Sequence, residues 1–229
     1  MEAKIIWEGK GLDPYIFGFF TIAYLIVLIW GIMKHRKTAS AVLFFVVFAL
    51  IYDNAILATG NLLGKGQLLE FLSYGRFWLH GLFTPMLILF SLFVMRESGI
   101  AFALKKWSTY LFGMLWIVAM VIEYLVGLRG LKLSPQEAYG VLSYASLHEV
   151  SGPPLMILLV FVALFIVAIA LAWKKKWWWM LVGTIVMTIG SAVPVTVNSN
   201  SLINAFELFL IVTLMLTAIH FSQKTKNRN

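Results

Sequence analysis

Seven long apolar runs constrain this chain more than any other feature of its sequence. Each run holds about 20 residues, which is the length that an α-helix needs to cross the hydrocarbon core of a bilayer. Backbone polar groups find no water inside a bilayer, so a spanning segment of this kind forms a helix that satisfies its own hydrogen bonds. We therefore predict an all-α integral membrane bundle of seven transmembrane helices. The predicted spans lie near residues 15–33, 39–58, 76–95, 107–127, 154–173, 177–196 and 202–221.

The amino-acid composition agrees with this class. Hydrophobic residues make up 61% of the 229 residues, charged residues make up only 12%, and the mean hydropathy is +0.90. A soluble domain of this length needs more charged residues to cover its surface. No internal repeat or soluble segment is apparent, so residues 1–229 are expected to form a single membrane domain. A run of full spanning length follows the mixed first 13 residues, so we expect the first helix to be an uncleaved anchor.

The basic residues predict the orientation of the bundle. Twelve of the 18 lysines and arginines follow the first, third, fifth and seventh runs. Because cytoplasmic loops carry an excess of Lys and Arg, the N-terminus is predicted outside and the C-terminus in the cytoplasm. These loops also explain the net charge of +8, so we expect membrane lipids and no nucleic acid as partners. The predicted location is the cell membrane, and the oligomeric state stays open.

Two connections on the predicted outer side are longer than a turn. In residues 128–153, Ser134 is a helix-capping residue type, Pro135 suits the first helical position, and Glu137 stands three residues after the cap. Apolar residues at helical spacing follow, so this pattern predicts a short helix on the membrane surface. In residues 59–75, glycines are expected to break the chain before the third helix. Either connection is interpreted as a lid or as a packed interfacial loop.

Ionisable residues inside the runs gather at one depth. With a rise of 1.5 Å per residue, they fall in the outer third of the membrane, and the inner half is nearly free of charge. A charge that faces acyl chains costs about 2.5 to 3.5 kcal/mol, so these groups are expected to face the bundle interior. They come from the predicted second, third, fourth and seventh helices and from the segment before the fifth. The members are Asp53, Arg76, His80, Glu123, Glu207, His148 and Glu149.

Helical spacing adds a common orientation to this common depth. Arg76, His80 and Thr84 are separated by four residues, which aligns them on one face of the third helix. Pro85 and Pro194 each remove a backbone hydrogen bond near this layer and are expected to open room there. A second set aligns on the last helix: Asn200, Asn204 and Glu207. The pattern predicts a polar cavity beneath the outer surface.

These residue types favour acid/base chemistry on a bound lipid-like or small-molecule ligand. Carboxylates in a low dielectric bind a proton or a cation, and histidine exchanges protons near neutral pH. We assign acid/base roles to Asp53, His80, Glu123 and Glu207. Substrate contacts are assigned to Asn54, Arg76, Thr84, His148, Glu149 and Asn204, with Arg76 expected to hold a negative headgroup.

Several established chemistries are excluded or disfavoured. The chain has no cysteine, which excludes disulfides, thiolate metal sites and a cysteine nucleophile. No HExxH motif occurs, so we expect neither a metal nor a cofactor. The last run holds no lysine, which excludes a retinal Schiff base at the place where rhodopsin-like proteins carry it. The HxxxH pair of ceramidase-like and adiponectin-receptor-like membrane hydrolases is also absent.

Three functions therefore remain open at the level of the sequence. The favoured one is an intramembrane enzyme, an isomerase, cyclase or hydrolase, that acts on a lipid or isoprenoid. The alternatives are a small-molecule or ion-coupled transporter, and a ligand-binding sensor or assembly factor. A fourth interpretation is purely structural, because polar residues often join helices and Arg76 can form an ion pair with Asp53 or Glu123.

Overall fold

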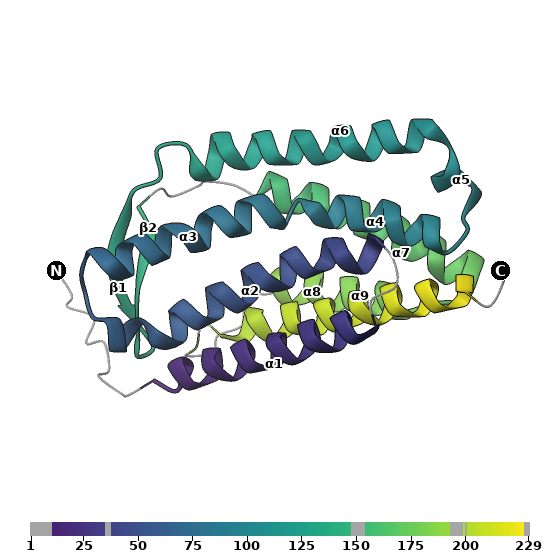
Figure 1. Ribbon diagram of the computed structural model, residues 1–229. Helices are drawn as coiled ribbons and strands as arrows, with labels where there is room; N and C mark the ends of the chain where they lie inside the picture. Colours follow the sequence, from purple (N-terminus) through teal and green to yellow (C-terminus); the bar gives the residue numbers. More distant parts are fainter. Residues whose placement is uncertain (1–10, 35–37, 148–153, 193–198, 200, 227–229) are drawn as a thin grey trace.

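A computed structural model describes residues 11–34, 38–147, 154–192, 199 and 201–226. Helices lie side by side in one bundle, and a single β-hairpin packs at one end (Figure 1). The helices are α1 (Asp13–Lys34), α2 (Thr38–Leu63), α3 (Gln67–Phe83), α4 (Met86–Glu97), α5 (Ala101–Leu104), α6 (Lys106–Glu123), α7 (Leu155–Lys175), α8 (Trp179–Ala192) and α9 (Leu202–Lys226). A π-helical turn, η1 (Tyr124–Leu128), continues α6, and the hairpin consists of β1 (Leu133–Ala138) and β2 (Val141–Ser146).

Six helical segments in the described part of the chain are long and apolar enough to cross a membrane. They are α1, α2, α3 with α4, α6 with η1, α7 and the Leu202–Gln223 part of α9. Six of the predicted runs are thus confirmed as helices of spanning length. The predicted run 177–196 contains α8, which has 14 residues and extends about 21 Å at 1.5 Å per residue. The count of seven spans and the orientation stay predictions.

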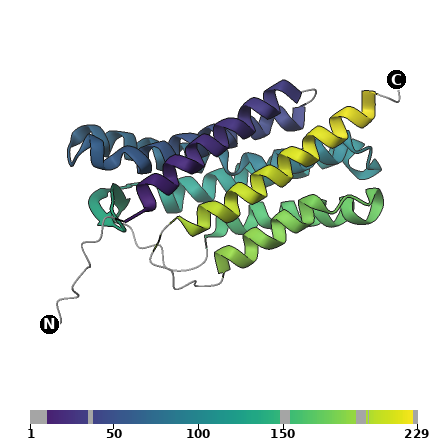
Figure 2. The same ribbon diagram turned by 90° about the horizontal axis from the view of Figure 1, so that it is seen from below.

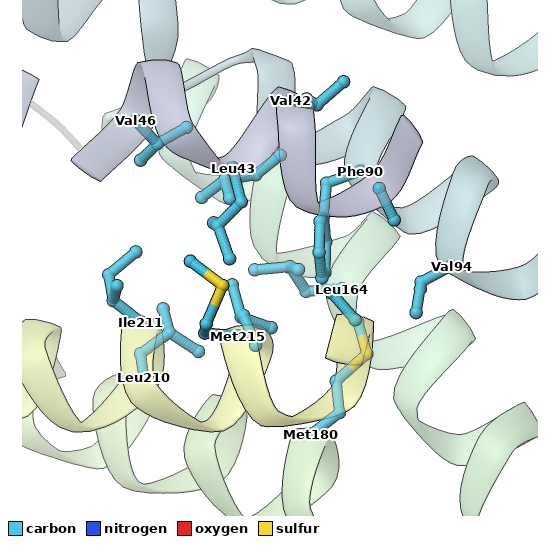
Figure 3. Close-up of a cluster of buried hydrophobic side chains, with 14 of the residues drawn as sticks. Val42, Leu43, Val46, Phe90, Val94, Leu164, Met180, Leu210, Ile211 and Met215 are labelled. Atoms are coloured by element: carbon cyan, nitrogen blue, oxygen red, sulfur yellow. The ribbon is translucent and has the colours of Figure 1, made fainter. Parts of the chain in front are cut away.

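The core of the bundle forms where α2, α4, α7, α8 and α9 meet. Apolar side chains of all five helices converge there, among them Leu43, Phe90, Leu164, Met180 and Met215 (Figure 3). By contrast, α1 and α6 lie at opposite edges of the bundle (Figure 1). Only 28% of the apolar window of α1 and 17% of that of α6 is buried, as expected for helices that present most of their surface to lipid.

The third apolar segment is interrupted at Pro85, where the sequence predicted the loss of one backbone hydrogen bond. Proline has no backbone N–H, and α3 ends at Phe83 while α4 begins at Met86. The break is short because Thr84 and Pro85 accept hydrogen bonds from the backbone N–H groups of Leu87 and Ile88. It lies one turn beyond His80.

The predicted connection 59–75 is wrong. α2 continues to Leu63 and α3 begins at Gln67, so only three residues separate the two helices. Gly64, at φ +71°, ends α2, whereas Gly60 remains helical. Asp53 is consequently ten residues before the end of α2, and Arg76 is the tenth residue of α3. Neither lies in a terminal turn.

The predicted surface helix after Ser134 is also wrong, because this segment is the β-hairpin. Ala138 pairs with Val141 across a turn formed by Tyr139 and Gly140. These two residues have φ values of 52° and 79°, and a two-residue turn with positive φ at both positions fits the twist of paired strands. Figures 1 and 2 place the hairpin at the end of the bundle where α2 joins α3.

Candidate functional site

An ion pair between α2 and α3 lies at the centre of the candidate site. Nε of Arg76 donates to Oδ1 of Asp53 at 2.7 Å. The two side chains retain 14% and 26% of their exposure, so the pair is largely removed from solvent. This contact confirms one of the two ion pairs that the sequence allowed for Arg76. Asp53 and Arg76 also line two neighbouring cavities.

The first cavity, here called the lateral cavity, collects four ionisable side chains from three helices. Its lining consists of Asp53, Arg76, Phe77, His80 and Glu123, and its volume is about 150 Å³. Arg76 and His80 enter it together because residues four apart share one face of α3. Glu123 reaches it from the last turn of α6. Four ionisable residues that lie far apart in sequence thus meet at one opening.

Glu123 is positioned by a close approach between α6 and α3. A β-carbon on Gly81 would lie 3.0 Å from Cγ of Glu123 and 3.0 Å from Cδ1 of Leu128. Any larger residue would require these two side chains to shift by a few tenths of an ångström. The turn that follows Glu123 is π-helical, and such turns are frequent at functional sites in α-helices.

The second cavity lies beneath the hairpin and is called the hairpin cavity. It has a volume of about 260 Å³ and opens between α1, α2, α3, α9 and the hairpin. Asn204 of α9 joins the Asp53–Arg76 pair on its helical side, and the two strands provide the other wall. The complete lining is Phe17, Asp53, Leu57, Arg76, Gln136, Ala138, Val141, Ser143 and Asn204.

A buried polar chain supports the floor of this cavity. Nδ2 of Asn204 donates to Oδ1 of Asn54 at 2.9 Å, and Nδ2 of Asn54 donates to the carbonyl oxygen of Leu50 at 2.8 Å. The buried Tyr24 hydroxyl donates to the carbonyl oxygen of Asn204 at 3.5 Å. Asn54 thus positions Asn204. Glu207 lies close enough to Asp53 and Tyr24 to interact electrostatically, but it lines neither cavity.

The structure leaves Thr84 outside both cavities. Thr84 caps the end of α3, and its backbone N–H donates to the carbonyl oxygen of His80. His148, Glu149, Asn200 and Pro194 lie outside the described residues.

Sequence reasoning missed Gln136 and Ser143, which line the hairpin cavity. The sequence signal for them was weak. Gly140 is a residue type common in turns, but Tyr139 is not, and the alternation of the flanking residues between two faces is a property of the observed strands. Helical spacing of the same apolar residues concealed this alternation.

The described residues contain no group of three or more His, Asp or Glu side chains arranged to hold a metal ion. No protein-family model matches the chain, and comparisons with curated proteins and with solved structures give no match either. Function is therefore inferred from the chemistry of the two cavities alone. The lateral cavity combines an imidazole, a carboxyl group and an ion pair, which is a set able to remove and return protons.

Proposed function

We propose that this chain is a multi-pass membrane enzyme that performs acid/base chemistry on a lipid or isoprenoid substrate. One observation carries the proposal: His80 and Glu123 face the same cavity, beside an ion pair that compensates its own charge. Two proton-exchanging groups held around one small space are what general acid/base catalysis requires. Helix packing alone gives no reason for four ionisable side chains to line one opening.

The position of the lateral cavity supports entry from the bilayer. It lies between α3 and the edge helix α6, which buries little of its surface. Apolar side chains of α6 and η1 near Glu123 are exposed, including Val121, Tyr124, Leu125 and Val126. In a membrane these side chains face acyl chains, so an amphiphile can keep its tail among lipids while its polar part enters between α3 and α6.

The proton balance favours an isomerisation. His80 takes a proton from one atom of the substrate while Glu123 gives a proton to another atom. The substrate gains and loses one proton, and no oxidant, reductant or water is consumed. Proton exchange through the cavity then restores His80 and Glu123. In this assignment Asp53 and Arg76 hold the polar part of the substrate, and Glu207 is a nearby carboxyl group outside both cavities.

The proposal includes a topology of seven spans with the N-terminus outside and the C-terminus in the cytoplasm of the cell. The basic residues that follow alternate spans support this orientation. The hairpin and both cavities then belong to the outer side of the cell membrane.

A comparison of cellular lipid profiles tests the proposed enzyme. Cells that produce the wild-type chain should convert a lipid species into an isomer, whereas His80→Ala and Glu123→Gln should abolish the conversion. Glu70→Gln is a matched control, because it removes a carboxyl group from α3 outside both cavities. If all four proteins reach the membrane at equal levels and the lipid profiles are identical, the enzyme proposal is wrong. A solute flux in proteoliposomes that requires His80 and Glu123 would instead identify a carrier.

A further inference from the structure

The hairpin turns one polar face toward its cavity. Gln136 lies directly opposite Ser143 in the antiparallel register, so the two side chains are neighbours on the same face. Both line the hairpin cavity. The opposite face carries Leu133 and Tyr144, which are buried against α2 and α3. The hairpin is thus anchored by Leu133 and Tyr144 on one face, and its other face directs Gln136 and Ser143 at the space beside Asp53.

Hydrogen-bonding capacity remains in this cavity. Among the described residues, no side-chain hydrogen bond is formed by Gln136 or Ser143. Arg76 donates to Asp53 through Nε, which leaves the two terminal guanidinium nitrogens. Asn204 donates through Nδ2, which leaves its Oδ1 as an acceptor. Donors and acceptors from three helices and two strands therefore converge, and a hydroxyl group can satisfy either kind.

The charge balance decides which ligand suits these groups. Asp53 and Arg76 cancel one another at 2.7 Å, and the other side chains that line the cavity are uncharged. A negative headgroup has to compete with Asp53 for Arg76. An uncharged ligand avoids this competition and the desolvation of an extra charge. Arg76 alone favoured a negative headgroup, whereas the Asp53–Arg76 ion pair favours an uncharged one.

The volume of the hairpin cavity, and the wall that it shares with the lateral cavity, indicate which part of a ligand it holds. At about 260 Å³ the hairpin cavity is smaller than the roughly 300 to 1,000 Å³ of sites for drug-sized molecules, so it suits a headgroup rather than a whole lipid. It shares Asp53 and Arg76 with the lateral cavity. We propose that the hairpin cavity binds an uncharged, hydroxyl-rich headgroup, a sugar or polyol, of an amphiphile. This inference rests on the proposed function, because the bound headgroup then places the adjoining atoms at His80 and Glu123.

Ligand-dependent thermal unfolding of the full chain in phosphatidylcholine nanodiscs tests this inference. An alkyl glucoside below its micelle concentration should stabilise the protein in a saturable way. An alkyl phosphocholine of equal chain length should not. Gln136→Ala and Ser143→Ala should each weaken glucoside binding about fivefold, the effect of one net hydrogen bond. Glu137→Ala, on the other face of the same strand, should bind like wild type.

A measurement with free glucose distinguishes a soluble sugar ligand from the sugar headgroup of an amphiphile. The inference expects it to stabilise the protein only at concentrations at least about a hundredfold higher than the glucoside, because it lacks a tail that lies among lipids. Equal potency of glucose would identify a soluble sugar and overturn the amphiphile. Saturable phosphocholine binding that Gln136→Ala removes, or glucoside binding that neither hairpin variant weakens, would overturn the uncharged headgroup.

Two active-site variants separate this inference from the proposed function. His80→Ala and Glu123→Gln leave the hairpin cavity intact and should bind the glucoside like wild type. If the glucoside fails to bind while these variants still abolish lipid conversion, the headgroup assignment is wrong and the enzyme proposal stands. If the glucoside binds as expected and no conversion depends on His80 or Glu123, the headgroup site stands without the enzyme.

Discussion

Gly60 is where α2 touches the backbone of the hairpin, and Gly60→Ala tests how firmly the hairpin docks. A β-carbon at this position would lie 1.9 Å from the carbonyl oxygen of Leu142, whereas ordinary contacts begin at 3.4 Å. This oxygen belongs to the strand backbone, so no rotation of a side chain relieves the overlap. The strand has to retreat by about 1.5 Å, the difference between these two distances.

The next residue sets the magnitude of the effect. Asn61 donates from Nδ2 to the carbonyl oxygen of Gly140, and its Oδ1 accepts from the backbone N–H of Leu142 at 2.8 Å. A displacement of about 1.5 Å breaks both hydrogen bonds, each worth about 1 kcal/mol. The docked hairpin should therefore lose about 2 kcal/mol, a factor of about 30 in its opening equilibrium. Alanine also favours the helix by up to about 1 kcal/mol, but it stabilises α2 whether or not the hairpin is docked.

Amide hydrogen exchange in β1 and β2 measures this opening. Exchange should accelerate about 30-fold in Gly60→Ala, in proportion to the opening equilibrium. Gly113→Ala is the matched control, because a β-carbon on Gly113 in α6 meets no atom within 4 Å. The reasoning is refuted if Gly60→Ala folds and its strands exchange at the rate of the control.

Three further predictions concern the cavities. In a double-mutant cycle of chemical unfolding, Asp53→Asn and Arg76→Gln should show a coupling of about 1 to 3 kcal/mol, between the values of exposed and buried pairs; a coupling near zero would contradict the ion pair. Gly81→Ala crowds the carboxylate side chain 3.0 Å away on α6 and should lower lipid conversion at least about tenfold, whereas Gly113→Ala should not; equal activity of both variants would refute this positioning. Asn54→Ala leaves buried hydrogen-bonding groups without partners and should cost about 1 to 3 kcal/mol in thermal unfolding; an unchanged melting temperature would exclude that role.

The residue types that line the lateral cavity could be predicted from the sequence, because their spacing within each helix does not depend on the rest of the fold. The spacing of Arg76 and His80 determines that they share one face of a helix, whatever surrounds that helix. The depth of Asp53 and Glu123 in their runs places them near the same layer. Thr84 shows the limit of this reasoning, since the same spacing included it although the helix ends before it.

Helix ends and the hairpin were harder to predict because distant contacts decide them. Gly60 is a residue type that often ends a helix, yet α2 continues through it and uses the missing β-carbon to receive the strand of Leu142. The segment after Ser134 carries a helix-start pattern and, at Gly140, a residue type common in turns. The burial of Leu133 and Tyr144 against α2 and α3 favours the strands.

By itself, the sequence determined that this chain forms long apolar helices, and that several of these helices carry ionisable groups. A membrane-spanning segment has to satisfy its own backbone, so its structure follows from its local composition. Only the tertiary structure decided that Arg76 pairs with Asp53, that Glu123 joins His80, and that two strands enclose a second cavity. These contacts join residues that are distant in the chain, and their energies depend on packing and charge balance that no local pattern contains.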